Sequence, residues 1–567
     1  MTDKFDKICI CAINASYSHS SLSVRCLAKA LDKDAIICEY TINDNLNKVV
    51  AELYKKACDL YAFSCYIWNI EFVLDVCQTL KKLMPDCVIM LGGPEVSYDA
   101  YDVMNQNSFI DYIICGEGEI ALNDFVNGKN LCNISGLVYR ESKNIVQNEI
   151  EPICELDVLP RLYTSDEVDK LKNKIIYYET SRGCPYMCTY CLSSTSHGVR
   201  FFGLDRVFAD LKMFMDCKAK LVKLTDRTFN IDIERTKKIL RFILEKNTQT
   251  CFHFEISADI LDDETIKLLN SAPSGFFQLE IGIQSTNKNT LCTIKRKTNI
   301  EKLFNNVLRL QKEHNMHIHL DLIAGLPHEN YTSFKKSFDD VFSLRPDMLQ
   351  LGFLKLLKGT QIHDEADKFG YCFNQKPPYE VLFNQFISYD ELIILKDVCE
   401  LVEKYYNSGS FEKAIEFVLK DFSSAYDFFY EFSLFWNEKG FDKQSQSKKG
   451  LYDIFYSFYR EHIGTELPKF SEYLKFDFMK NNKKLSLPQW ASKAGSKTFY
   501  NSVYNFIRSE EGAKYFRHYT GAKLCDVIQA VSVEKFNFDV CNTGNFGKYV
   551  IIFDYKNNTF TKIEDFF

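Results

Sequence analysis

Residues 7 to about 125 alternate short apolar runs with longer amphipathic stretches, which predicts strands separated by helices. The strand-length runs lie at 7–14, 60–66, 87–93 and 111–119. The stretches at 21–31 and 70–84 place apolar residues at helical spacing instead. This order is typical of a doubly wound parallel sheet, in which ligands bind beyond the carboxyl ends of the strands. We therefore expect an α/β domain whose polar turns form a ligand site.

A second alternating series begins near residue 175 and contains strand-length runs with helical segments between them. The runs lie at 175–182, 221–226, 251–257, 276–284, 317–325 and 347–357. Six strand–helix repeats are fewer than the eight of a closed barrel. We therefore expect a central partial (β/α)6 barrel that stays open on one side.

After about residue 366 the strand rhythm fades, and helical spacing with many aromatic residues takes over. The helical segments lie at 401–422, 424–440 and 449–463, and a small sheet is expected around 549–555. The chain then divides into four parts. These are a Rossmann-like N-terminal domain (1–135), a connector with a small hairpin (136–169), the partial barrel (170–365) and a mostly helical C-terminal domain (366–567).

Composition narrows the function classes without naming one. The formal charge of −7 gives no electrostatic footprint for nucleic acid, so we do not expect a nucleic-acid partner. No apolar run reaches the roughly 18 to 20 residues of a membrane helix, and the start lacks a signal-peptide pattern. The 21 cysteines are an odd number and are scattered through predicted strands and helices, as free thiols would be. We expect a cytoplasmic protein, with no membrane insertion, that is a monomer.

The strongest chemical motif is SRGCPYMCTYCLSS, which follows the strand predicted at 175–182. It places Cys184, Cys188 and Cys191 in a C-x3-C-x2-C array. Three thiolates this close can hold three irons of a cubane and leave the fourth iron open. A structural zinc site would need a fourth protein ligand, which His197 could supply, so zinc remains an alternative.

This motif, with Tyr190 before the last cysteine, resembles that of the radical S-adenosylmethionine (SAM) superfamily. The resemblance implies that the three cysteines bind a 4Fe-4S cluster, whose open iron holds SAM. Reduction by an electron donor such as flavodoxin or ferredoxin would then cleave SAM to a 5′-deoxyadenosyl radical. It also implies SAM contacts at the ends of the barrel strands. The implied residues are Tyr190 near the adenine, Asp226 at the methionine ammonium, Glu255, Ser257, Asp259, Glu280, Gln284, Asp321 and Gly325.

The segments LGGPEVSYD, GEGE, RGCPYMCTYCLSS and LEIGIQS, in this order, resemble the cobalamin-dependent class B methylase branch of that superfamily. The resemblance implies that the turns of the N-terminal domain surround cobalamin. The implied residues are Asn14, Ser16, Tyr17, His19, Ser64, Tyr66, Trp68, Gly92, Gly93, Glu117 and Gly118. Gly92 and Gly93 lack Cβ atoms, so we expect backbone there to approach the cofactor closely.

The N-terminal domain departs from one familiar cobalamin pattern. It has no Asp-x-His-x-x-Gly loop, and His19 is its one histidine. We therefore expect cobalamin to bind without a histidine lower ligand, and we expect His19 to begin a helix or contact the corrin.

The two implied cofactors predict a methyltransferase that acts on an unactivated carbon of a small molecule. Two alternatives stay open. With the same cofactors, the chain could catalyse a non-methylating oxidation, rearrangement or cyclisation, or it could be a non-enzymatic protein that senses cobalamin or redox state. Residues 366–567 contain no catalytic constellation, and segment 363–369 could cap the open side of the barrel.

Overall fold

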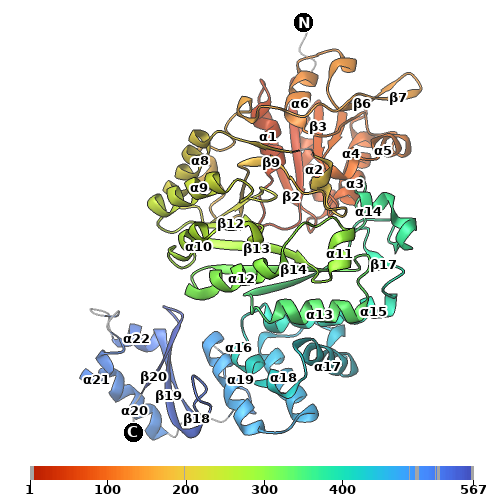
Figure 1. Ribbon diagram of the computed structural model, residues 1–567. Coiled ribbons are helices and arrows are strands. Elements are labelled where there is room, and N and C mark those ends of the chain that lie inside the picture. Colours follow the sequence, from red (N-terminus) through yellow and green to blue (C-terminus); the bar gives the residue numbers. More distant parts are fainter. Residues whose placement is uncertain are drawn as a thin grey trace. The chain divides into compact units, whose positions relative to one another are not determined.

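The computed structural model describes residues 5–196, 198–483, 485–491, 497–516, 519 and 524–563. The chain forms two compact units (Figure 1). The first contains residues 1–346 and 350–392, and the second contains residues 347–349 and 393–567.

A seven-stranded sheet opens the first unit, with the order β2-β1-β3-β4-β5-β6-β7. Its strands are β1 (Ile8–Asn14), β2 (Ala35–Thr41), β3 (Leu60–Ser64), β4 (Val88–Gly92), β5 (Tyr112–Ile114), β6 (Leu137–Glu141) and β7 (Asn144–Gln147). β1 to β5 run parallel, which confirms the expected parallel sheet. The hairpin β6–β7, which we placed in a connector, pairs antiparallel with β5 and extends this sheet.

Helices cover both faces of this sheet, as a doubly wound fold requires. They are α1 (Leu22–Ala30), α2 (Leu46–Lys56), α3 (Ile70–Leu83), α4 (Pro94–Ser97), α5 (Ala100–Gln106) and α6 (Gly118–Val126). Alternate residues of β1 separate the two cores: Cys9 and Cys11 pack with α2 and α3, whereas Ile8 and Ile10 pack with α1 and α6. Because both faces of the sheet are buried, the sequences of central strands such as β1 are almost continuously apolar.

The second sheet of this unit has six strands in the order β15-β14-β13-β12-β11-β8. They are β8 (Ile176–Tyr178), β11 (Leu221–Leu224), β12 (Cys251–Glu255), β13 (Phe277–Gln284), β14 (His317–Ala324) and β15 (Met348–Phe353). The helices between them are α8 (Leu204–Asp216), α9 (Ile233–Lys246), α10 (Asp263–Asn270), α11 (Lys288–Thr293), α12 (Ile300–Leu310) and α13 (Tyr331–Phe342). β8 and β15 are the two edges, so the expected open (β/α)6 barrel is confirmed.

Side chains of the barrel strands alternate between a covered and an open face. In β13, Leu279 and Ile281 are fully buried on the face that helices cover, whereas Gln278 and Glu280 on the other face are partly exposed. β12 and β14 repeat this alternation. The inside of a closed barrel is normally packed with branched apolar residues. Polar side chains on this open face instead favour a ligand site.

The second unit is mostly helical with a small antiparallel sheet, as expected. Its helices include α16 (Glu412–Val418), α17 (Ala425–Glu438), α18 (Lys448–His462), α19 (Leu467–Asn481) and α20 (Lys497–Arg508), and its sheet contains β18 (Val531–Phe538), β19 (Phe546–Asp554) and β20 (Thr559–Ile563). Aromatic rings fill its core; for example, Phe432 and Phe458 stack with their centroids 4.5 Å apart. Among the described residues, no helix combines the length and apolarity needed to cross a membrane.

Candidate active site

A short hairpin carries the three-cysteine motif. Its strands are β9 (Ser181–Gly183) and β10 (Val199–Phe201), which pair antiparallel, and the loop between them contains all three cysteines. Gly183 has a φ of 95°, and a Cβ there would lie 2.1 Å from the carbonyl oxygen of Gly198. Only glycine fits where the two strands meet so closely. The hairpin therefore forms the stem of the cysteine loop.

The three thiols lie close enough to influence one another. Cys184 and Cys188 are buried. Burial raises the pKa of the Cys188 thiol, Cys191 and Cys184 add to the rise, and the Arg296 guanidinium opposes it. Three neighbouring thiols in one loop suit a soft metal centre such as an iron–sulfur cluster. His197, the residue that could have completed a zinc site, lies outside the described residues.

Arg296 is a site residue that our sequence reading missed. Its positively charged guanidinium lies beside Cys188 and Tyr190 and donates a hydrogen bond to the Gly282 carbonyl. Burial raises the pKa of Tyr190, and the positive charge of Arg296 opposes that rise. The signal in the sequence was the basic triplet 295–297, which follows α11 and which we did not connect to the cysteines.

Asp226, the residue expected at the methionine ammonium, is buried and hydrogen-bonded within the protein. Its side chain is 1% exposed and accepts hydrogen bonds from the Thr180 amide at 2.9 Å, the Thr180 hydroxyl at 2.6 Å and the Ser181 hydroxyl at 2.5 Å. In this arrangement Asp226 ties the end of β11 to the start of the cysteine hairpin. The expected contact of Asp226 with the methionine ammonium stays a prediction.

Ser257 and Asp259 follow β12 and are also engaged within the protein. The Ser257 hydroxyl donates to Asp259 at 2.8 Å, and the other Asp259 oxygen accepts from the Asn299 amide at 3.0 Å. Tyr186 of the cysteine loop lies beside Ser257. These contacts bring the end of β12, the start of α12 and the cysteine loop together.

Two further expected SAM residues end the next strands. Gln284 has a φ of 73°, and its buried Oε1 atom has no hydrogen-bond partner among the described residues. An orphaned buried amide oxygen is costly unless a ligand supplies a donor, so Gln284 fits a bound hydroxyl or amine. Gly325 has a φ of 89°, and its carbonyl accepts from Tyr371 and Asn384, both at 2.9 Å. Its role in the structure is to form a turn.

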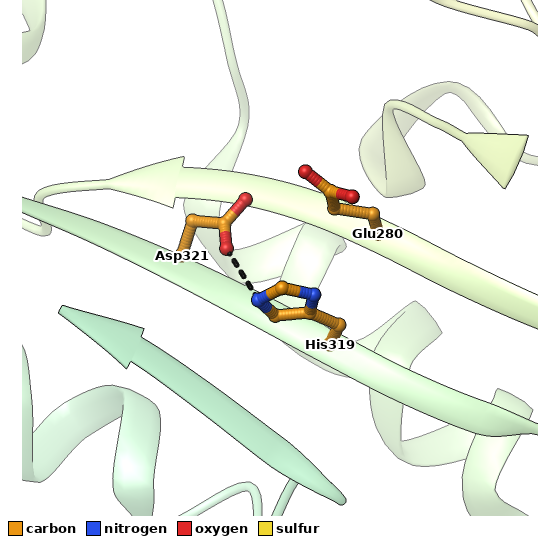
Figure 2. Close-up of side chains that lie close together, drawn as sticks. All are labelled: Glu280, His319 and Asp321. Carbon is orange, nitrogen blue, oxygen red and sulfur yellow. Dashed lines mark ion pairs between the residues drawn. The ribbon is translucent and has the colours of Figure 1, made fainter. Parts of the chain in front are cut away.

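An ionisable cluster lies on the open face of the barrel sheet. Glu280 lies directly across from His319 in the strand register, and Asp321 follows on the same strand as His319. Figure 2 shows the carboxylates of Glu280 and Asp321 turned toward each other above the His319 ring, and the ligand atoms of all three lie within 4.8 Å of one another. His319 Nε2 is 2.9 Å from Asp321 Oδ1.

Basic partners hold Glu280 in its charged form. Lys223 Nζ and His253 Nε2 each lie 2.9 Å from Glu280 Oε2. Burial opposes the charge of Glu280, but the His253 hydrogen bond and Lys223 outweigh it and lower its pKa to about 2. Burial also raises the pKa of Glu255, whose carboxylate is 3.7 Å from Lys223. Lys223, His253 and His319 could not be identified from the sequence, because single inward-facing residues on strands have no diagnostic spacing.

The turn after β1 reaches the edge strand of the barrel. His19 Nδ1 lies 2.5 Å from the Tyr177 hydroxyl, and the Ile175 amide donates to Ser18 at 2.8 Å. Burial and the charge of Lys223 both lower the pKa of His19. Nearby, Asn14 contacts Glu39 at 3.3 Å and Ser16 contacts Ser18 at 2.8 Å.

Exposed aromatic rings mark the same edge of the N-terminal sheet. Tyr66 and Trp68 stack with centroids 4.5 Å apart and planes 3° apart. Trp68 is 46% exposed and Tyr17 is 76% exposed. Flat, exposed aromatic surface beyond the strand ends fits a large ring ligand. Ser64, by contrast, is buried and contacts the Cys11 carbonyl at 3.5 Å.

The glycines of this domain serve the fold. Gly93 has a φ of 108°, and a Cβ there would lie 2.6 Å from the Cys65 carbonyl oxygen. At Gly118 a Cβ would lie 3.0 Å from Leu27, and at Gly92 it would make an ordinary contact with Ile114. Packing inside the domain thus accounts for a glycine at position 93, and the expected approach of its backbone to a cofactor stays a prediction.

The turns after β4 reach the other edge of the barrel. Asp99 pairs with Lys358 at 2.6 Å, and Glu95 accepts a hydrogen bond from Tyr379; both partners follow β15. Tyr98 also contacts Thr195, just beyond the cysteines, at 2.8 Å. The carboxyl edge of the N-terminal sheet therefore contacts both edges of the open barrel, since His19 already contacts β8.

Three family models match successive parts of the chain. They are the B12 binding domain at residues 8–126, the radical SAM superfamily at residues 178–341 and a protein family of unknown function, DUF4080, at residues 367–553.

Relatives of known name align with about half of the chain. A 2-(S-pantetheinyl)-carbapenam-3-carboxylate methyltransferase of Streptantibioticus cattleyicolor is 26% identical over 49% of this chain and 44% of its own length. The cobalamin-dependent radical SAM methyltransferase TokK of Streptomyces tokunonensis is 24% identical over the same shares. The chain thus spans less than half the length of these relatives.

A solved structure shares the fold. It is the cobalamin-dependent SAM radical enzyme OxsB with aqua-cobalamin and SAM bound, at 15% identity and a TM-score of 0.56. The likeness covers 83% of this chain and 79% of that one.

Proposed function

We propose that this chain, in which a B12-binding domain precedes a radical SAM domain, is a cobalamin-dependent methyltransferase. One observation carries the proposal. The carboxyl edge of the N-terminal sheet contacts β8 through His19 and the segment after β15 through Asp99, so it spans the open side of the barrel. Ligands bound at the two sites would therefore face one shared space.

The residues present fit the implied cofactors. Cys184, Cys188 and Cys191 would hold a 4Fe-4S cluster through their thiolates. Gln284, with its orphaned oxygen, would bind SAM, and the exposed rings of Tyr17 and Trp68 would contact the corrin. His19 already contacts Tyr177, which supports cobalamin without a histidine lower ligand. When bound, these groups supply a hydrogen-abstracting radical and a transferable methyl group.

The protein itself contributes binding, orientation and exclusion of water. Asp226 orients the cysteine hairpin, and Arg296 places a positive charge beside the cysteines. The cluster of Lys223, Glu280 and His319 offers charged and hydrogen-bonding groups on the open face of the barrel. These groups favour a polar small molecule as the substrate, because an apolar molecule would leave them desolvated and unpaired.

An external protein would supply the electron, and one cavity suits its approach. A cavity of about 480 Å³ is lined by Met187 of the cysteine loop and by Lys295 and Lys297 after α11. Both lysines are exposed. Two positive charges beside the cysteines favour a donor with an acidic face, such as flavodoxin. The free thiols of the chain favour a reducing cytoplasm.

The proposal is tested with SAM labelled in its methyl group. Anaerobically reconstituted protein, with cluster and cobalamin loaded, is incubated with a reductant and with a small-molecule extract of the source cells. We expect label in cobalamin and in a product, together with 5′-deoxyadenosine. If deoxyadenosine forms while neither cobalamin nor any product gains label, methyl transfer is wrong, and the non-methylating radical reaction takes its place. The cysteine triple variant C184A/C188A/C191A must form no deoxyadenosine.

A further inference from the structure

The stem of the cysteine loop places two arginines directly opposite each other. Arg182 on β9 and Arg200 on β10 are Cα partners in the strand register. Like charges directly opposite on paired strands destabilise the pair. This arrangement therefore needs negative charge from elsewhere in the molecule.

Glu117 supplies that charge from the N-terminal sheet domain. Its carboxylate accepts two hydrogen bonds from the Arg200 guanidinium, at 2.8 and 3.0 Å, which form a bidentate pair. It also forms an ion pair with Arg182 Nη1 at 3.2 Å. It also accepts from the Ile153 amide at 2.8 Å. Bidentate pairs between arginine and carboxylate fix orientation as well as adding energy.

Two further carboxylates complete the cluster around Arg182. Glu119 lies 2.5 Å and Glu179 lies 2.7 Å from Arg182 Nη2. The side chains of Arg182, Glu117 and Glu119 are 13%, 20% and 7% exposed, so water screens their charges only weakly.

The two ends of this cluster belong to different parts of the proposed active site. Glu117 and Glu119 begin α6, where the helix dipole favours negative charge. The arginines form the stem of the loop that holds the cysteines. Buried ion pairs of this kind contribute little net stability compared with apolar packing, but they can specify geometry.

We propose that Glu117, clamped between Arg182 and Arg200, is a positioning residue that fixes the cysteine loop relative to the cobalamin edge of the N-terminal sheet. The inference rests on the proposed function. It also gives the carboxylate of the GEGE turn a role other than the cobalamin contact that we expected from sequence. The clamp matters for any step that needs both cofactors and not for a step that needs the cluster and SAM alone.

The test compares Glu117→Gln with Asp263→Asn in fully loaded protein. Asp263 pairs with Arg309 at 2.7 Å on the helical side of the barrel, so its variant also removes one carboxylate from an arginine pair. Two rates are measured without any substrate: reductive cleavage of SAM to 5′-deoxyadenosine, and methyl transfer from SAM to reduced cobalamin. For Glu117→Gln we expect unchanged cleavage and methyl transfer slower by about 100-fold, the scale of a misplacement near 1 Å. Asp263→Asn should change neither rate.

A direct measurement of geometry separates failure of the clamp from failure of the proposed function. Pulsed dipolar EPR between cob(II)alamin and the reduced cluster reports their separation whether or not a methyl group is ever transferred. A narrow distance distribution in the wild type that broadens or shifts in Glu117→Gln supports the clamp. Identical distributions in the two proteins overturn it. Wild-type protein that never methylates cobalamin contradicts the proposed function instead.

If Glu117→Gln does not fold, Arg200→Lys replaces it. Lysine keeps the charge but cannot form the bidentate pair. We expect the cobalamin–cluster distance distribution of this variant to broaden in the same way, while its unfolding temperature stays that of the wild type. An unchanged distribution again rejects the clamp.

Discussion

At the scale of single residues, burial decides which side chains are available for chemistry. Glu329 follows the Gly325–Pro327 turn and is completely buried. Its Oε1 accepts from Ser285 at 2.6 Å and from Ser337 at 2.8 Å, whereas its Oε2 has no hydrogen-bond partner among the described residues. Burial raises the pKa of Glu329 from its ordinary 4.5 to about 7, although the two serines oppose the rise.

This shift predicts how stability depends on pH. A carboxyl group with a raised folded-state pKa stabilises the protein below the unfolded value, and the contribution is lost as pH rises through the folded value. Wild type should therefore lose stability between pH 4.5 and 7, whereas Glu329→Gln has no such group. When the pH rises from 4 to 8, we expect the free energy of unfolding of the variant to increase by about 3 kcal/mol relative to that of wild type. Urea unfolding at both pH values checks this, and parallel stabilities would contradict it.

At the same scale, the sequence placed the three cysteines in one loop but did not identify the partners of the polar residues. Short spacing within one loop keeps cysteines together in any fold, so their proximity could be predicted from the sequence. The hydrogen-bond partners of Asp226 and Glu117 could not be predicted, because they come from segments at least 36 residues away in sequence. Glu117 meets Arg182 only after two sheets have formed and docked.

At the scale of elements, strong apolar runs gave the right strands, and weak ones were missed. β2 lies at the sheet edge and has only Cys38 buried, so its sequence AIICEYT lacks both a continuous apolar run and a clean alternation. The hairpin β6–β7 was recognised, but its pairing with β5 depends on a neighbour that sequence spacing does not identify. Most of β9 was predicted as the end of the strand at 175–182, and β10 was not predicted, because each strand of the stem has only three residues.

The stem also yields a prediction about cluster assembly. Gly183→Ala would force a Cβ to within 2.1 Å of the Gly198 carbonyl oxygen, so the two strands must separate. We expect the variant to lose most of its iron and sulfide after anaerobic reconstitution. Gly128→Ala is the matched control: its φ of 77° is also positive, but a Cβ there meets nothing within 4 Å. The control pays only backbone strain of about 1 kcal/mol and should keep its cluster. Equal iron contents in both variants would contradict a steric requirement at the stem.

At the scale of the whole molecule, the surface beside the cysteines should decide how electrons enter. Lys295→Glu/Lys297→Glu reverses the charge at the cavity lined by Met187. We expect SAM cleavage driven by reduced flavodoxin to slow by about tenfold at low salt, since opposite charges steer encounter, while cleavage driven by titanium(III) citrate stays unchanged. Lys312→Glu, an exposed lysine outside that cavity, is the control. Equal losses with both reductants would mean that the lysines act on the cluster instead of on donor docking.

The arginine pair on Glu117 also has a consequence for biogenesis. Domains emerge from the ribosome in chain order and generally fold as units. Glu117 and α6 belong to a sheet domain whose strands β1 to β5 are complete before Arg182 is synthesised. The arginines of the cysteine stem therefore leave the ribosome when their carboxylate partner already stands on a folded domain, so the loop takes its orientation from that domain and not the reverse.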